Sequence, residues 1–214
     1  MSNLTCSNGF GLDLRSTYNL LSGAYRSLRE HRVKVFLDKV DLCYERMTPE
    51  KKAELNDYVH SPEGQRIMGE YAEAILHSPS NTAKMAMAML YCKDPDFDFT
   101  DGQIKVFVKA MVEMTDDLIE FFLLAISQRY NDREPYPTSV IYKVNYQPFR
   151  EKGWDEALII VYGQELIKRN LLLPNHSSPT MSDGAGRHGW GFVFGANAQS
   201  KKMAALLRKA REYS

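Results

Sequence analysis

Hydrophobic residues recur at alternating intervals of four and three along the start of the chain. This first stripe contains Leu14, Tyr18, Leu21, Tyr25 and Leu28. The spacing places all of them on one face of a helix. A second stripe follows after a gap of five residues and contains Val33, Phe36, Val40, Cys43 and Met47. The gap predicts either a bend near residues 29–32 or a contact surface that rotates around the helix.

Helix-start signals divide the residues that follow. A hydroxyl residue precedes proline at Thr48-Pro49, Ser61-Pro62 and Ser78-Pro79, and such pairs cap a helix and open its first turn. Thr100 and Gln103 have the spacing of a capping box, and Thr115 caps one more helix. These signals predict six or seven helices with short joints, an antiparallel helical bundle or array. The methionines of these helices are expected in its core: Met85, Met87, Met89, Met111 and Met114.

The pattern changes after about residue 130. Residues 128–153 hold three prolines, and Val140, Tyr142 and Val144 alternate as in a strand. Five segments come next: a helix over 155–170, the apolar run Leu171–Leu173, a polar loop, a strand-like segment over 190–194 and a basic helix over 198–211. We therefore predict a mainly α chain with a helical domain over residues 1–134 and a small α+β domain over 135–214.

Residues 184–189 spell G-x-G-x-x-G within "MSDGAGRHGWGFVFG". A dinucleotide site needs a strand before this loop and a helix directly after it. Here a polar loop precedes Gly184, a strand-like segment follows Gly189, and a helix starts only near Ala198. We therefore predict a flexible basic loop and no nucleotide cofactor.

The segment "ELIKRNLLLP…GWGFVF…SKKMAALLRKA" resembles the winged-helix superfamily in the order and spacing of its elements. The resemblance implies that Arg187 and His188 lie at the tip of a wing that touches nucleic-acid phosphates. It also implies that Lys168 and Arg169 belong to the helix that enters the major groove. Residues 157–162 of that helix are all apolar, however, which favours a core position over reading of base edges.

The two ends of the chain differ in charge. Residues 1–139 carry 16 Lys/Arg against 21 Asp/Glu, residues 140–214 carry 11 against 6, and the whole chain is neutral. On the last helix, a broad face opposite Met203 is basic and contains Lys201, Lys202, Arg208 and Lys209. Such a stripe neutralises phosphates, and its alternative role is a solvated outer face with cations near a helix C-terminus.

Other kinds of chemistry find little support. Cys6, Cys43 and Cys92 are too few and too widely spaced for a disulfide framework or a cysteine-rich zinc site. The aspartates between residues 94 and 101 lack the glycine and final glutamate of a calcium-binding EF-hand loop. No apolar run reaches the roughly 20 residues of a membrane helix, and the start does not look like a secretion signal. We therefore expect a cytoplasmic protein without metal, cofactor or catalytic residues.

Three hypotheses for function follow. The leading one is a non-enzymatic regulatory protein, whose helical domain binds a protein partner or self-associates while the winged-helix-like module contacts DNA or RNA. The alternative is an immunity- or antitoxin-like adaptor without nucleic-acid binding, whose C-terminal module docks onto the acidic helices of residues 94–134. The third is a helical ribonuclease, because Arg26 and His31 have the R-x4-H spacing that resembles the HEPN signature.

Overall fold

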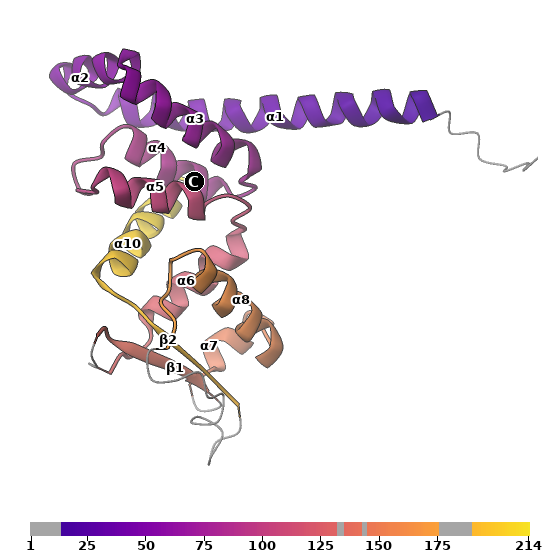
Figure 1. The fold of residues 1–214 in the computed structure, drawn as a ribbon, viewed down its shortest axis with the longest axis vertical. Helices are drawn as coiled ribbons and strands as arrows, with labels where there is room; N and C mark the ends of the chain where they lie inside the picture. Colours follow the sequence, from indigo (N-terminus) through magenta and orange to yellow (C-terminus); the bar gives the residue numbers. More distant parts are fainter. Residues whose placement is uncertain (1–13, 132–134, 143–144, 176–189) are drawn as a thin grey trace, which may run out of the picture.

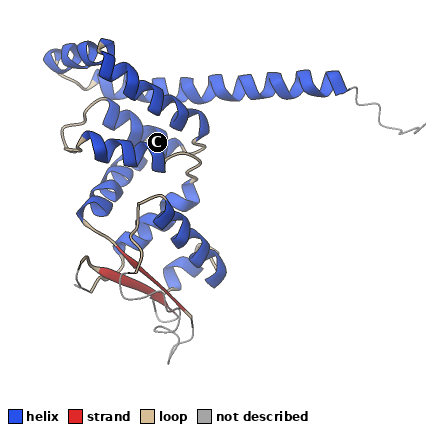
Figure 2. Ribbon diagram, in the orientation of Figure 1, coloured by secondary structure: helices blue, strands red, loops and turns tan. Residues whose placement is uncertain are grey.

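A computed structural model of the chain describes residues 14–131, 135–142, 145–175 and 190–214. Its helices are α1 (Leu14–Glu45), α2 (Pro49–His60), α3 (Pro62–His77), α4 (Asn81–Tyr91), α5 (Asp101–Ala110), α6 (Asp116–Ser127), α7 (Gln147–Arg150), α8 (Glu156–Lys168) and α10 (Ala198–Glu212). Its strands are β1 (Thr138–Tyr142) and β2 (Gly191–Gly195). The chain is thus mainly helical with a small antiparallel sheet near the C-terminus, as the sequence predicts (Figure 2).

The predicted helix caps are confirmed at four places. Thr48, Ser61 and Thr115 each accept a hydrogen bond from a backbone N–H of the first turn. Thr100 and Gln103 form the complete capping box of α5. The prediction is wrong at Ser78, because the Ser78 amide still bonds the Ala74 carbonyl and so ends α3.

Helix α4 forms the centre of the core. All its side chains from Thr82 to Tyr91 are buried, and α1, α6 and α10 pack against it. The five methionines that the sequence assigns to the core are buried. A helix that is buried on every side needs neighbours on every side, so α4 fixes the positions of the elements around it.

Helix α1 is one uninterrupted helix, which projects far beyond the body of the molecule (Figure 1). Its C-terminal part packs on α3 and α4 and buries Phe36. The helix therefore does not bend at the gap between the two apolar stripes. The gap separates the exposed Leu21, Tyr25 and Leu28 from the second stripe, which reaches the core through Phe36 and Val40. Arg32 marks the edge of the body, because its guanidinium donates a hydrogen bond to the Leu76 carbonyl of α3.

The sheet pairs β1 with β2 in antiparallel register, from Thr138 opposite Gly195 to Tyr142 opposite Gly191. The apolar run Leu171–Leu173 contributes only a single bridge to this sheet, between Leu173 and Gly195. Leu171 and Leu172 are instead buried, and their amides bond the Leu166 carbonyl at the end of α8. Leu171 and Leu172 therefore complete the C-terminal end of α8, and Leu173 is the residue of the run that contacts the sheet.

Helix α10 returns from the sheet to the N-terminal helices and packs on α4 and α6 (Figure 1). Both of these helices precede the predicted boundary near residue 135. The predicted division into residues 1–134 and 135–214 stays a prediction, and the last helix joins its two parts.

Candidate functional site

The residues predicted to contact nucleic acid lie in three different settings. Arg187 and His188, at the predicted wing tip, lie outside the described residues, as does the whole glycine-rich loop. Strand β2, rather than a helix, starts at Gly191 directly after that loop. The strand predicted over residues 190–194 is therefore confirmed to within one residue.

Lys168 and Arg169 are adjacent in the sequence and differ completely in environment. The side chain of Lys168 is 80% exposed, whereas that of Arg169 is 14% exposed. Arg169 donates hydrogen bonds to the carbonyls of Ala110 (2.9 Å) and Val112, at the C-terminal end of α5. Its guanidinium also pairs with Glu165 at 2.8 Å. Arg169 therefore ties α8 to α5.

A groove of about 810 Å³ surrounds this pair between α3, α5 and α8. Its charged lining residues are Glu70, Glu73, Lys105, Lys109, Glu113, Glu165, Lys168 and Arg169. Cations and carboxylates are equal in number there, so the groove does not present the single sign of charge that attracts a phosphate backbone.

The predicted basic face of α10 lies on the side of the exposed Ala205, opposite the buried Met203. Lys201 lies above the ring of Tyr130, and Lys202 lies above the ring of Phe99 at 4.6 Å. Arg208 donates a hydrogen bond to the Leu123 carbonyl, at 3.3 Å. No carboxylate pairs with these three cations among the ion pairs of the described residues.

Lys209, the fourth cation of that face, is held by acidic partners. Its ammonium pairs with Asp94 at 2.8 Å and with Asp96 at 2.7 Å. Burial alone lowers the pKa of Lys209, but the hydrogen bonds to both carboxylates outweigh it and raise the pKa. Near the same end of α10, Arg211 lies 3.6 Å from Glu120 of α6. The C-terminal helix is thus joined to the acidic segment of residues 94–134.

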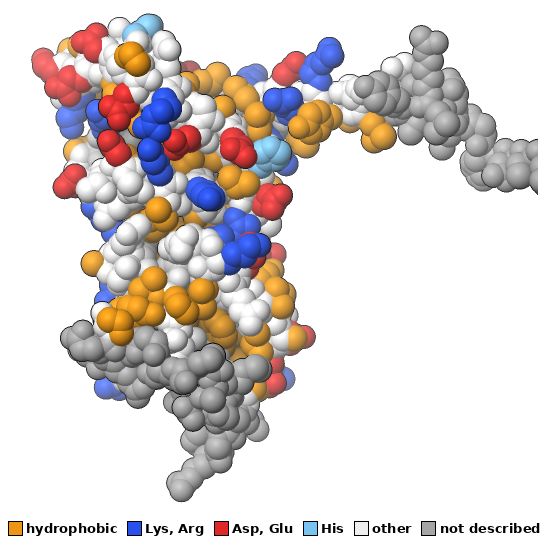
Figure 3. Space-filling model, viewed as in Figure 1, with side chains coloured by type: hydrophobic (Ala, Val, Ile, Leu, Met, Phe, Trp, Pro, Cys, Tyr) orange, Lys and Arg blue, Asp and Glu red, His pale blue; other side chains and the backbone are white. Residues whose placement is uncertain are grey.

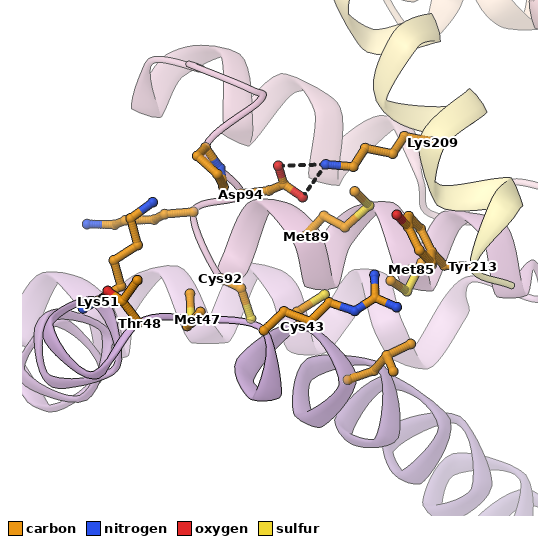
Figure 4. Close-up of a pocket in the computed structure, with 14 residues that line it drawn as sticks. Cys43, Met47, Thr48, Lys51, Met85, Met89, Cys92, Asp94, Lys209 and Tyr213 are labelled. Carbon is orange, nitrogen blue, oxygen red and sulfur yellow. Dashed lines mark hydrogen bonds and ion pairs between the residues drawn. The ribbon is translucent and has the colours of Figure 1, made fainter.

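Lys209 also lines a pocket of about 400 Å³ between α1, α4 and α10 (Figure 4). The other cations at this pocket are Arg46, Lys51 and Lys93, and its sulfur-containing residues are Cys43, Met47, Met85, Met89 and Cys92. Arg46 also lies 4.5 Å from the centre of the Tyr213 ring. Sequence reasoning missed this pocket, because its walls come from distant segments: Lys209 and Asp94 alone are 115 residues apart.

The projecting part of α1 is the second feature that sequence reasoning located only in part. We call residues 14–31 the α1 arm. Every side chain described there is exposed, namely those of residue 19 and residues 21–31. Leu21, Tyr25 and Leu28 of the first stripe are 66%, 56% and 46% exposed. Figure 3 shows hydrophobic and basic side chains along this projection.

Arg26 and His31, the pair of the ribonuclease hypothesis, belong to this arm and are both exposed. They lie five positions apart on a continuous helix, which turns their side chains about 140° away from each other. The two side chains therefore point in different directions, and the arm does not aim them at one substrate.

Metal clusters and membrane-spanning helices are both absent from the described ranges. No group of three His, Cys, Asp or Glu side chains within them is arranged to hold a metal ion. None of the helices they contain combines the length and apolar character that a membrane span requires. Comparisons of the chain with protein families, with curated proteins and with solved structures find no match.

Proposed function

We propose that this chain is an interaction protein whose α1 arm binds an acidic amphipathic helix of a partner protein. One observation carries the proposal: the first apolar stripe lies on a helix that projects from the body, with every described side chain exposed. Helices in proteins gain most of their stability from the packing of an amphipathic face. Burial of an exposed leucine stabilises a complex by about 1.5–3 kcal/mol. The arm therefore gains both order and apolar burial from a partner.

The stripe has the spacing of a coiled-coil seam. Its residues recur at four and three, with leucine at Leu14, Leu21 and Leu28 and tyrosine between them. Such a seam packs against the seam of another helix by knobs-into-holes contacts. The arm remains one straight helix up to the body, so a partner helix has about 27 Å of surface to follow.

The charges beside the stripe favour an acidic partner. The positions that flank a coiled-coil seam hold Arg15, Arg29 and His31 here, and no carboxylate. Glu30, the only acid in the sequence of the arm, lies about 160° around the helix from Leu28 of the stripe. A second copy of the arm offers these cations nothing to pair with, whereas a helix with glutamates beside its apolar seam complements them.

Two synthetic peptides test this proposal. Both have leucine at the seam positions, and the flanking positions hold glutamate in one and lysine in the other. We expect the glutamate peptide to bind the full-length chain in fluorescence anisotropy, with an affinity that falls as salt rises. The lysine peptide is expected to bind at least tenfold more weakly.

Two variants show whether the stripe is responsible. Leu21→Ala combined with Leu28→Ala is expected to weaken binding at least tenfold, because it removes seam contacts and keeps the helix. Leu37→Ala, at an exposed leucine of α1 outside the stripe, is the matched control and changes binding less than twofold. Equal binding of the two peptides contradicts the proposal. So does a dimer in sedimentation that the double variant dissociates, since a second copy then occupies the stripe.

A second candidate function, contact with nucleic acid, is favoured by the arrangement of the sheet. In the sheet, β2 pairs with β1 and also forms a bridge with Leu173. In the chain, α7 and α8 lie between β1 and Leu173. This arrangement supports a winged-helix-like module. The cations Lys201 and Lys202, which no described carboxylate pairs, would add phosphate contacts to those expected from Arg187 at the predicted wing tip.

Anisotropy with duplex DNA across a salt series tests this second candidate. Binding that weakens steeply with salt, and weakens further in Lys201→Ala/Lys202→Ala, supports it. Arg187→Ala combined with the same changes is expected to remove binding at physiological salt. Absence of binding at low salt, or binding that these changes leave unaltered, contradicts it.

A further inference from the structure

Two cysteines that are distant in the sequence meet at the pocket between α1, α4 and α10. Cys43 belongs to α1 and is half-buried, and Cys92 caps the C-terminal end of α4 and is buried. Both line the pocket (Figure 4). The Cys92 Sγ also lies 3.8 Å from the carbonyl oxygen of Val40, which is three residues before Cys43 on α1. The Cys92 thiol therefore faces α1 at the level of Cys43.

The two thiols are unequal. Interaction with the Cys92 thiol lowers the pKa of Cys43, whereas interaction with Cys43 joins with burial to raise the pKa of Cys92. Arg46 and Lys209 lower the pKa of Cys43 further, whereas burial and Asp94 act in the opposite direction. Asp94 is itself paired with Lys209, and Lys39 adds a further positive charge near Cys43. Cys43 is thus the thiol that ionises first.

The pocket gives small reagents a route to Cys43. Its volume of about 400 Å³ is open beside Arg46, Lys51 and Lys93. A thiol that is accessible, has a lowered pKa and lies next to a second thiol has the arrangement of an oxidation-sensitive pair. Cys92 lines the same pocket but is only 2% exposed.

We propose that Cys43 and Cys92 are a modification site, oxidised by a hydroperoxide to an intramolecular disulfide between α1 and α4. The Cys43 thiolate attacks one peroxide oxygen, so that an S–O bond forms and the O–O bond breaks. The leaving alkoxide takes a proton from water, and Cys43 becomes a sulfenic acid. The Cys92 sulfur then attacks the Cys43 sulfur and expels hydroxide, which leaves as water with the Cys92 proton. Two thiols and one hydroperoxide give one disulfide, one alcohol and one water.

The bond would join two helices that already pack together. It closes a loop of about 50 residues, which restricts the unfolded chain and raises the melting temperature by roughly 5–10 °C. The disulfide lies in the packed part of α1, beyond the α1 arm, so this proposal does not depend on the proposed function.

The test uses full-length protein that carries Cys6→Ser, because Cys6 lies outside the described residues. One equivalent of hydrogen peroxide is added to the native protein, and the products are measured by intact mass and by alkylation. We expect a loss of about 2 Da, protection of both thiols from alkylation, and reversal by dithiothreitol. The Cys92→Ala variant is expected to stop at a sulfenic acid on Cys43, which dimedone captures. The Cys43→Ala variant is expected to give no product.

Rate measurements separate this site from ordinary thiol oxidation. The native reaction is expected to reach half its maximal rate at a lower pH than the urea-unfolded protein. Arg46→Gln is expected to slow it several-fold, and Arg66→Gln, which replaces an exposed arginine of α3, is the matched control. Native thiols that react no faster than unfolded ones contradict the proposal. Disulfides that form only between molecules, or dimedone capture at Cys92, contradict it as well.

Discussion

Replacement of Arg169 by alanine tests whether this predicted nucleic-acid residue holds the fold together. The change removes hydrogen bonds to the carbonyls of Ala110 and Val112 and an ion pair with Glu165. A hydrogen bond to a charged group contributes about 1.5–3 kcal/mol, and a helical ion pair about 0.3–0.5 kcal/mol. Both carbonyls border the groove, where water replaces part of the loss. We therefore expect the free energy of unfolding to fall by about 2–3 kcal/mol.

The assay is thermal and urea unfolding followed by circular dichroism. A loss of this size lowers the melting temperature by about 4–12 °C in a chain of this length. Lys168→Ala is the control, because this exposed neighbour lacks the bonds to α5, and we expect a change within about 0.5 kcal/mol. Arg169→Lys keeps the charge without the planar fork and is expected to fall between the two. Equal melting temperatures for Arg169→Ala and Lys168→Ala would refute the assigned role.

Further predictions concern packing and pH. Gly163→Ala places a methyl group 2.1 Å from the Phe192 ring and is expected to lower the free energy of unfolding in urea by about 1–3 kcal/mol. The methyl group of Gly69→Ala meets nothing within 4 Å, so this change is expected to raise the free energy of unfolding by up to about 1 kcal/mol. A hydrogen bond from Lys152 holds the pKa of Glu120 below its usual value. Ionised Glu120 therefore stabilises the folded chain above the pKa that this carboxyl has in the unfolded chain, and this contribution is lost as the pH falls through its pKa in the folded chain. Glu120→Gln is therefore expected to cost about 0.5–1 kcal/mol at pH 7 and nothing near pH 2, and an equal cost at both pH values would contradict this role.

Local signals predict the helices because they act within a few residues. The Thr48, Ser61 and Thr115 caps each need only their own first turn, so sequence spacing suffices to find them. The helix over 156–168 and the basic last helix also follow from local periodicity. The alternation that begins at Val140 misses the first two residues of strand β1, Thr138 and Ser139, because the start of the strand depends on pairing with β2, about 50 residues further along.

Features that depend on distant packing are beyond the sequence. Lys168 and Arg169 are equivalent cations in the sequence. Only the position of α5 makes Arg169 a structural residue that connects α8 to α5. Lys209 likewise reads as part of a basic stripe until the loop of Asp94 folds beside it. The sequence shows the apolar stripe of the α1 arm as a pattern. It does not indicate that the other helices pack only on the later part of α1 and leave this stripe exposed.

Hydrogen–deuterium exchange of the α1 arm tests the central claim most directly. In the free protein, amides of residues 19–30 are expected to exchange far faster than those of α4, because the described side chains of the arm are all exposed. Addition of the glutamate-flanked peptide is expected to slow them strongly, and the lysine-flanked peptide is expected to have no effect. Arm amides that are as protected as α4 in the free protein, or that the glutamate-flanked peptide leaves unchanged, would contradict the account.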